Sequence, residues 1–268
     1  MIPREACMTR NREGDVLMKL IFAGTGDALG IPAIGCGCKI CTMAREKEGK
    51  NRRRRSSVIL SNNSDTLLYD TPPTIGDVLN QNRIFHISAI FLSHKHYDHI
   101  GGITEFEYWP EKIPVYGNMS ALGNFEITGN LYENCEFHVL HDRKTVKVNS
   151  IEVTPFPILH SVPTYGMVFS ASNKRIVHFN DKQYLQLNDY QKAMMEKANV
   201  AVFHTPGYSG KTGHTTVSGV MMLAKKYPDT RIVISHIGHN NLSHEEIEEN
   251  VSTYENIIVA YDNMEIEV

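Results

Sequence analysis

The chain has 268 residues, of which 41% are hydrophobic and 21% charged, and this composition is typical of a globular protein with a substantial core. The formal net charge of −3 gives no general attraction for nucleic acid or an anionic membrane. No apolar run approaches the roughly 18 to 20 residues that cross a bilayer. We therefore expect a cytoplasmic protein without a membrane partner. Nucleic acid is the less favoured ligand, and a homodimer is one candidate for the oligomeric state.

The N-terminal segment, residues 1–17, mixes charged and polar side chains and lacks the apolar centre of a secretory signal. We expect it to form a loosely ordered extension, with residues 18–268 as one domain. Residues 18–26 predict a strand that runs into a glycine-rich turn. The highly charged residues 43–55 predict a short helix followed by an exposed basic stretch, Arg52 to Arg55.

The rest of the chain predicts many short strands and a few helices. The strands are expected at 57–60, 66–69, 89–92, 113–116, 136–140, 144–148, 151–155, 165–170, 175–179, 200–203, 232–235 and 257–260. The helices are expected near 74–81, 187–196, 216–226 and 244–253. Strands come first as neighbours and later alternate with helices, which favours an α/β fold of two sheets covered by helices over a simple doubly wound sheet.

A dense group of polar residues follows the apolar strand at 89–92. His94, His96, Asp98 and His99 place four metal-ligand side chains within six residues. Alternate residues of an extended segment share one face, so His94 and His96 can reach one ion, and the following turn can direct Asp98 and His99 to a second. Imidazole and carboxylate together suit zinc, manganese or iron. Structural histidines usually occur singly, so the pattern indicates a metal site.

Further ligands are needed to complete two open sites, and three polar residues stand where later strands end. They are His160, Asp181 and His236. Residues at strand ends recurrently build the sites of layered folds. These three are therefore candidate ligands.

The order of these motifs resembles the metallo-β-lactamase superfamily, over most of residues 19–262. The resemblance implies an αββα four-layer sandwich with a dinuclear metal centre between its sheets. It implies that one metal is held by His94, His96 and His160, the other by Asp98, His99 and His236, and that Asp181 bridges them. Asp70, at the end of the strand 66–69, matches the aspartate that supports the ligand loop in this superfamily.

The cysteines point to a second metal site. Cys36, Cys38 and Cys41 lie within six residues, and the total of five cysteines does not favour a disulfide framework. Three thiolates can close around one tetrahedral zinc if a fourth ligand comes from elsewhere, and His239 stands three residues after His236. This arrangement is similar to the phosphoribosyl cyclic phosphate phosphodiesterase family of the carbon-phosphorus lyase pathway, which implies a structural zinc bound by these four residues.

The resemblance also implies hydrolysis by a hydroxide that bridges two divalent metals, with Asp181, Asp98 and His214 as catalytic residues. Residues 213–216, Gly-His-Thr-Thr, resemble an element of phosphodiesterases, including transfer-RNA 3′-processing nucleases. His214 can then bind phosphate or act as general acid, although the threonines could instead cap a helix. The favoured substrate is a small cyclic or nucleotide-like phosphodiester.

Three alternatives stay open. They are an RNA-processing endonuclease with the same chemistry, a thioester or lactam hydrolase, and a redox or cofactor-biosynthesis member of the superfamily. A histidine at position 96, where flavodiiron oxidases carry glutamate, argues against the redox variant.

The remaining histidines and cysteines receive structural interpretations. We expect His178 and His204 to be core or rim residues. We expect surface positions for His86, His138, His141 and His244. Cys7 and Cys135 have no partners in the sequence pattern. Arg52 to Arg55 could form an anion-binding rim or a solvated charge run.

Overall fold

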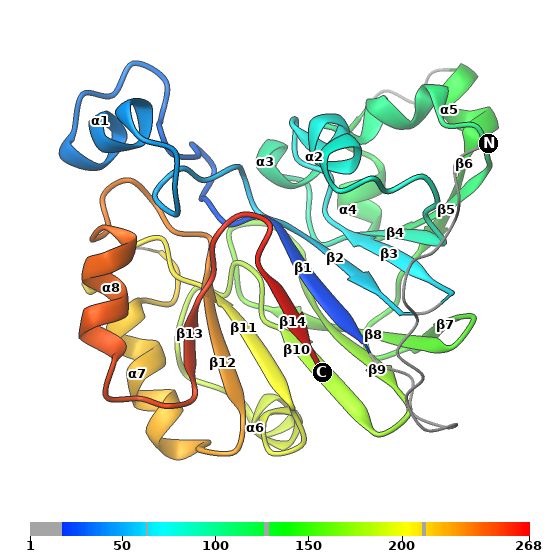
Figure 1. Ribbon diagram of the computed structural model, residues 1–268. Helices are drawn as coiled ribbons and strands as arrows, with labels where there is room; N and C mark the ends of the chain where they lie inside the picture. The colour runs from blue at the N-terminus through cyan, green and yellow to red at the C-terminus, as the bar shows by residue number, and fades with distance from the viewer. Residues whose placement is uncertain (1–17, 63, 126–128, 211–212) are drawn as a thin grey trace, which may run out of the picture.

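The computed structural model describes residues 18–62, 64–125, 129–210 and 213–268, and the extension predicted over 1–17 lies outside the described residues. The chain forms two seven-stranded sheets that lie face to face (Figure 1). The first sheet has the order β14 (Glu265–Glu267), β1 (Lys19–Gly24), β2 (Ser57–Ser61), β3 (Thr66–Tyr69), β4 (Ala89–Leu92), β5 (Ile113–Gly117) and β6 (Cys135–Val139). The second has the order β13 (Ile257–Val259), β12 (Arg231–Ser235), β11 (Val200–His204), β10 (Lys174–His178), β9 (Thr164–Ala171), β8 (Ile151–Ile158) and β7 (Val146–Val148).

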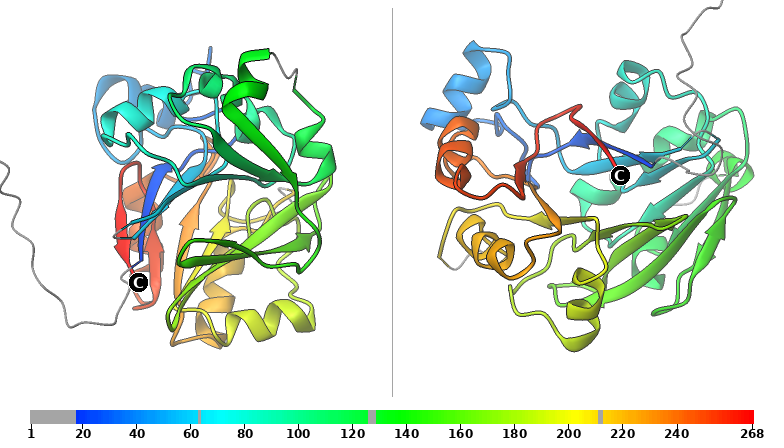
Figure 2. Two further views of the ribbon diagram at one scale, coloured as in Figure 1. Left: turned by 90° about the vertical axis from the view of Figure 1, so that its right-hand side faces the viewer. Right: turned by 60° about the horizontal axis from the view of Figure 1, so that its bottom comes forward.

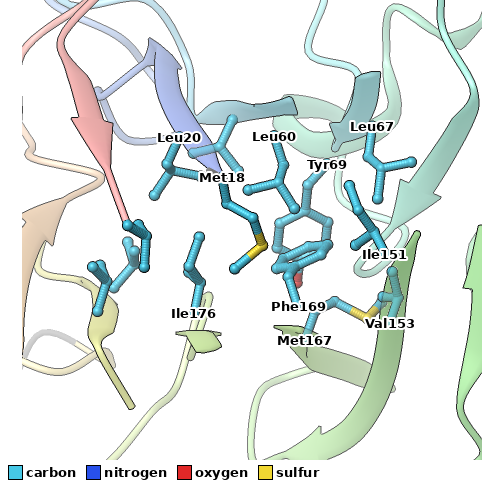
Figure 3. Close-up of a cluster of buried hydrophobic side chains, with 14 of the residues drawn as sticks. Met18, Leu20, Leu60, Leu67, Tyr69, Ile151, Val153, Met167, Phe169 and Ile176 are labelled. Carbon is cyan, nitrogen blue, oxygen red and sulfur yellow. The ribbon is translucent and has the colours of Figure 1, made fainter. Parts of the chain in front are cut away.

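In the first sheet, β1 to β4 are buried on both faces, which explains their nearly continuous apolar sequences. In β1, Leu20 and Phe22 belong to the core between the sheets, whereas Ile21 and Ala23 belong to the layer beneath the outer helices. This division follows from the period of two along a strand. Figure 3 shows side chains of the two sheets meeting in the central core, including Leu60 from β2 and Phe169 from β9.

Helices cover the outer face of each sheet (Figure 2). The first sheet is covered by α2 (Ile75–Gln81), α3 (Tyr97–Ile100), the 3-10 helix η1 (Ile103–Tyr108), α4 (Met119–Leu122) and α5 (Gly129–Asn134). The second is covered by α6 (Asp189–Met195), α7 (Val217–Lys226) and α8 (His244–Val251). The remaining helix, α1 (Lys39–Glu46), lies within the long connection from β1 to β2. The predicted αββα sandwich is confirmed.

Two predicted boundaries are wrong. The helix expected from residue 43 begins at Lys39, because Cys38 caps it by accepting a hydrogen bond from the amide of Cys41. The strand at 257–260 is not the last, since β14 follows it and pairs with β1. The four short helical segments between Tyr97 and Asn134 were not predicted, because each spans only one or two turns.

The strand directions place the carboxyl ends of several strands at one edge. In the first sheet, β3 and β4 are parallel, and in the second, β10, β11 and β12 are parallel. Three non-glycine residues just after these strands have positive φ angles, namely Asp70 (65°), Asn180 (47°) and His236 (56°). Left-handed backbone at such positions is costly and clusters at functional sites. In the described part of the chain, no helix is both long and apolar enough to cross a bilayer.

Candidate metal centre

Five strand ends deliver polar side chains to one point between the sheets. His94 comes two residues after β4, His160 two residues after β8, and Asp181 three residues after β10. His204 is the last residue of β11, and His236 follows β12 directly. All five residues are buried or half-buried, and the structure brings four of the predicted ligands together here.

The first group of ligand atoms comes from His94, His96, His160 and Asp181, and these atoms lie within 4.8 Å of one another. His96 Nδ1 lies 2.9 Å from His94 Nε2 and 3.2 Å from His160 Nε2. Asp181 Oδ2 lies 3.5 Å from His94 Nε2 and 3.6 Å from His160 Nε2. Ligand atoms bound to one tetrahedral zinc at about 2.0 Å are separated by about 3.3 Å. The four atoms therefore have the spacing of a single coordination polyhedron.

The hydrogen bonds around His94 determine which of its ring nitrogens is free to bind a metal. The Ser93 hydroxyl donates to Asp70 Oδ2 (2.8 Å), so its oxygen accepts the bond from His94 Nδ1 (2.9 Å). Burial holds the pKa of His94 well below its usual value, so the ring is neutral. Its proton is on Nδ1, and the lone pair of Nε2 points into the group of ligand atoms.

A second group is centred on His99. His99 Nε2 lies 3.2 Å from Asp98 Oδ2 and 3.4 Å from Asp181 Oδ2. His236 Nε2 lies 3.7 Å from Asp181 Oδ1. The structure thus brings Asp98, His99 and His236 around the same carboxylate that closes the first group, as a bridging aspartate requires.

The carboxylates around His99 favour a cation in the second group. Burial opposes a charge on His99, but Asp98, Asp181 and Asp70 outweigh it and raise the pKa of His99 well above its usual value. Within the described residues, His99 Nε2 is fully buried and has no hydrogen-bond partner. A buried nitrogen without a partner, facing two carboxylates, fits a divalent cation between them. The residues present therefore suit two divalent metals.

Asp70 holds the second group in place. Its Oδ2 accepts hydrogen bonds from His99 Nδ1 (2.7 Å) and Asn180 Nδ2 (3.1 Å), and its Oδ1 accepts one from the amide of Ser93 (2.7 Å). The bond to Nδ1 fixes the ring of His99 with Nε2 toward the centre. This is the supporting position that the sequence predicted for Asp70.

The Asp181 carboxylate is surrounded by histidines. Burial tends to raise the pKa of Asp181, but His236, His99 and hydrogen bonds from neighbouring histidines outweigh it and hold the pKa well below its usual value. Burial also lowers the pKa values of His160 and His236 to about 4. The carboxylate is therefore ionised and these two imidazoles neutral near pH 7, the states in which they bind metals.

His204 has a closer relation to the centre than the sequence predicted. Its Nδ1 donates to Asp181 Oδ1 at 2.6 Å, and its Nε2 lies 3.2 Å from the Ser56 hydroxyl. Although its position groups it with His99, Asp181 and His236, both its nitrogens are engaged, and Asp98 is the better fourth ligand. His204 orients the Asp181 carboxylate. Its place at a strand end, shared with the predicted ligands, was the signal that could have identified it. His178 is a buried, neutral core histidine, as predicted.

His214 lies on the more open side of the centre. Its Nε2 is 3.5 Å from Asp181 Oδ2, and 20% of its side chain is exposed. The ring also lies 5.3 Å from that of His160 and 5.7 Å from that of His236, centroid to centroid. Thr216, two residues on, caps α7 by accepting a hydrogen bond from the amide of Gly219 (3.2 Å). The capping role and the position of His214 therefore coexist in one short segment.

The cysteine site is also brought together. Cys36, Cys38, Cys41 and His239 place their ligand atoms within 4.8 Å of one another. His239 Nδ1 lies 3.2 Å from Cys36 Sγ and 3.7 Å from Cys38 Sγ, close to the roughly 3.5 Å expected around a tetrahedral zinc. A hydrogen bond from the amide of Cys41 lowers the pKa of Cys38 to about 6, whereas burial raises the pKa of Cys41 to about 11. All described cysteines are free thiols, and Cys7 lies outside the described residues.

The two metal groups are joined through one loop. His236 and His239 both lie in the segment after β12, and Ile237 between them bonds to the turn after β1, where its amide donates to Thr25 O (2.8 Å). Gly238 packs so closely that a Cβ there would lie 2.4 Å from Asp27 Oδ2. These contacts hold the turn that leads into the cysteine segment against the loop that carries His236 and His239.

Two surface predictions are wrong. Arg53 is only 3% exposed, because residues 52–55 run as an extended segment whose alternate side chains turn inward. Its guanidinium donates to Thr25 Oγ1 (2.7 Å) and Ala260 O (2.6 Å), and it contacts His244 Nδ1 (2.9 Å). His244, expected on the surface, is therefore buried at the start of α8, where Glu248 approaches its other nitrogen (2.9 Å).

Two curated proteins match part of the chain. The octanoyltransferase of Porphyromonas gingivalis is 29% identical over 108 residues, which are 39% of this chain and 21% of that protein. The coenzyme PQQ synthesis protein B of Methylobacterium radiotolerans is 26% identical over 164 residues, 55% of this chain and 54% of that protein. The chain thus spans about a fifth and about half of the lengths of these relatives.

Solved structures share the fold over nearly the whole chain. A diphosphatase of the PhnP family has a TM-score of 0.82 at 22% identity, covering 94% of this chain and 97% of that one. The short form of human tRNase Z has a TM-score of 0.68 at 18% identity, covering 92% and 98%. At these identities the likeness is one of fold.

A family model decides the membership. The model described as the beta-lactamase superfamily domain matches residues 66–237, a span that contains all the candidate dinuclear ligands and Asp70. The chain therefore belongs to the metallo-β-lactamase superfamily, as its histidine and aspartate motifs predicted.

Proposed function

We propose that the protein is a dinuclear metal-dependent phosphodiesterase that hydrolyses a small cyclic or nucleotide-like phosphodiester. The observation that carries this proposal is the position of His214, a partly exposed residue beside both ligand groups, with its Nε2 3.5 Å from the Asp181 carboxylate. An imidazole at this point can contact both the phosphate and the oxygen that leaves it. Zinc or manganese is the proposed pair of metals, with iron as an alternative.

When bound, the two metals would activate water and neutralise the charge of the phosphate. The residues of the chain have separate tasks. The Asp181 carboxylate lies next to both ligand groups, and the hydrogen bond from His204 fixes its orientation. Asp98 closes the second group beside His99. His214 donates a proton to the leaving oxygen, and for this it must be protonated when substrate binds.

The basic stretch supports a small substrate over RNA. Arg53 is buried among neutral acceptors, and Arg54 Nε lies 3.5 Å from Asp262 Oδ2. Two of the four arginines are thus engaged inside the fold and add little to a track for a nucleic-acid backbone. The sequence also lacks a lysine- and glycine-rich insertion of the kind that gives tRNA-processing relatives an arm for long RNA.

The names of the curated relatives supply two competing activities, acyl transfer and cofactor synthesis. Because the chain spans only about a fifth and about half of those proteins, neither name is a stronger guide than the chemistry of the site. A thioester or lactam carbonyl is a second electrophile that a dinuclear centre could attack. A thioester is therefore included among the substrates tested.

The test is metal analysis followed by a substrate panel. We expect two catalytic metal ions and one zinc per chain. We expect the loaded protein to hydrolyse bis-p-nitrophenyl phosphate and a cyclic ribose phosphate, and to leave a precursor transfer RNA and a thioester intact. A fully loaded protein that cleaves no phosphodiester contradicts the proposal. Cleavage of the precursor RNA alone would favour the endonuclease.

Replacing His214 with alanine is expected to lower kcat about 10²- to 10⁴-fold for an ester with an alkoxide leaving group. The loss should be much smaller for a p-nitrophenyl ester, since p-nitrophenolate leaves without a proton. Initial rates on both esters measure the difference. The metal content should stay unchanged.

His141→Ala removes an exposed histidine and serves as the matched control, with no change on either ester. Equal losses of His214→Ala on both esters would mean that His214 binds phosphate and does not donate the proton.

A further inference from the structure

A buried lysine follows the bridging aspartate directly. Lys182 is only 4% exposed, although its neighbour Asp181 is already part of a crowded ionic centre. Within the described residues, the Lys182 ammonium makes no hydrogen bond and no ion pair, and only its backbone groups are engaged. A buried lysine side chain whose ammonium lacks a counter-ion is destabilising unless solvent or a ligand compensates the charge. Lys182 has no role in the metal centre described above.

Lys182 lines a cavity of about 300 Å³ between the loop after β8 and the start of α6. Leu159 and Tyr184, both largely exposed, form apolar parts of its wall, and Gln186 and Gln191 add amide groups. Of the described residues that line this cavity, none has a carboxylate. A single cation among amides and apolar surface is a suitable setting for an anionic group.

The cavity is built from the loops that carry the catalytic residues. Leu159 precedes His160, and the amide of Gln183 donates to Leu159 O (2.9 Å), which joins the two loops. Thr215, next to His214, donates to Lys182 O through both its amide (2.9 Å) and its hydroxyl (3.2 Å). The cavity walls are therefore hydrogen-bonded directly to the segments that bear His160, Asp181 and His214.

We propose that this cavity is a subsite for a second anionic group of the substrate, a phosphate or carboxylate that pairs with Lys182. This inference rests on the proposed phosphodiesterase function and narrows its substrate class. The substrate is then a phosphodiester that carries a further terminal anion. The second anionic group of the substrate is then the counter-ion of Lys182.

The kinetic test compares two esters that differ by one phosphate. They are the p-nitrophenyl ester of thymidine 5′-monophosphate and the same ester with a 3′-phosphate. The metal-loaded protein should prefer the phosphorylated ester in kcat/KM by about 10-fold or more, as expected for one charge-assisted contact. Lys182→Gln should bring this ratio close to one, and Lys182→Arg should retain part of it. A carboxylate in place of the 3′-phosphate distinguishes the two kinds of anion.

Lys192→Gln is the matched control, because Lys192 is an exposed lysine of α6 that pairs with Asp189 outside the cavity. It should leave the ratio unchanged. A ratio that is the same in Lys182→Gln as in the unaltered protein, or an unaltered protein without preference, overturns the subsite.

A binding measurement separates this inference from the proposed function. Calorimetric titration of the loaded protein with inorganic phosphate should detect one binding event fewer in Lys182→Gln than in the unaltered protein. Lys182→Met should also raise the melting temperature without phosphate by a few degrees, because it removes an uncompensated buried charge. If no phosphodiester is cleaved but these differences appear, the proposed function fails and the anion site stands. Identical titrations with an unchanged or lower melting temperature exclude the site.

Discussion

Replacing Asp181 with alanine is expected to lower turnover at least about a thousandfold and to reduce the catalytic metal content. The reason is that its carboxylate lies next to both ligand groups, with Oδ2 near His94, His160 and His99 and Oδ1 near His236. Without this carboxylate, both groups lose a ligand and the negative charge that offsets two cations. Metal analysis together with initial rates on a phosphodiester measures the effect.

Asp189→Ala provides the control for Asp181→Ala, because Asp189 is an exposed aspartate that, among the described residues, pairs with the neighbouring Lys192. It should change neither rate nor metal content. Retention of both catalytic metals and of more than a tenth of the activity in Asp181→Ala would show that Asp181 does not bridge the two groups.

The second large effect is expected at the cysteine site. Cys38→Ser should lose one equivalent of zinc and lower the melting temperature by roughly 10 °C, because a closed zinc site contributes folding free energy. Cys38 matters twice, since its sulfur approaches His239 and also caps α1. Thermal unfolding followed by circular dichroism, with zinc measured on the same samples, tests this.

Cys135→Ala is the matched control, since Cys135 is a buried thiol of β6 outside the cysteine group. It should keep all its zinc and lose only the stability expected for one buried sulfur, about 1 to 2 kcal/mol. If Cys38→Ser kept its zinc and stability but lost turnover, the cysteine site would have to be catalytic.

The candidate ligands could be predicted because metal-binding residue types occur close together in the sequence. His94, His96, Asp98 and His99 are close in sequence as well as in space. Asp181 and His236 follow apolar strands, so the strand pattern itself identified them. The two-sheet fold was predicted from the same strands and their order. Their proximity in the structure is a consequence of parallel strands whose carboxyl ends meet at one edge.

Other features depend on contacts that no local pattern records. The charge of Arg53 predicted exposure, yet the fold supplies Thr25, Ala260 and His244 as acceptors from distant segments. His204 lacks a motif, and only the position of Asp181 reveals its role. Lys182 likewise differs from a surface lysine only in its burial and lack of partners.

The pairing of β1 with β14 has a consequence for how the protein folds. Lys19 lies opposite Glu267, so the edge of the first sheet joins residues from the two ends of the described chain. Contacts between such distant segments form slowly, because a long loop must close before any stabilisation is gained. During synthesis, one edge of β1 therefore stays unpaired until β14 has left the ribosome. Until then, that edge is open to pairing with other chains.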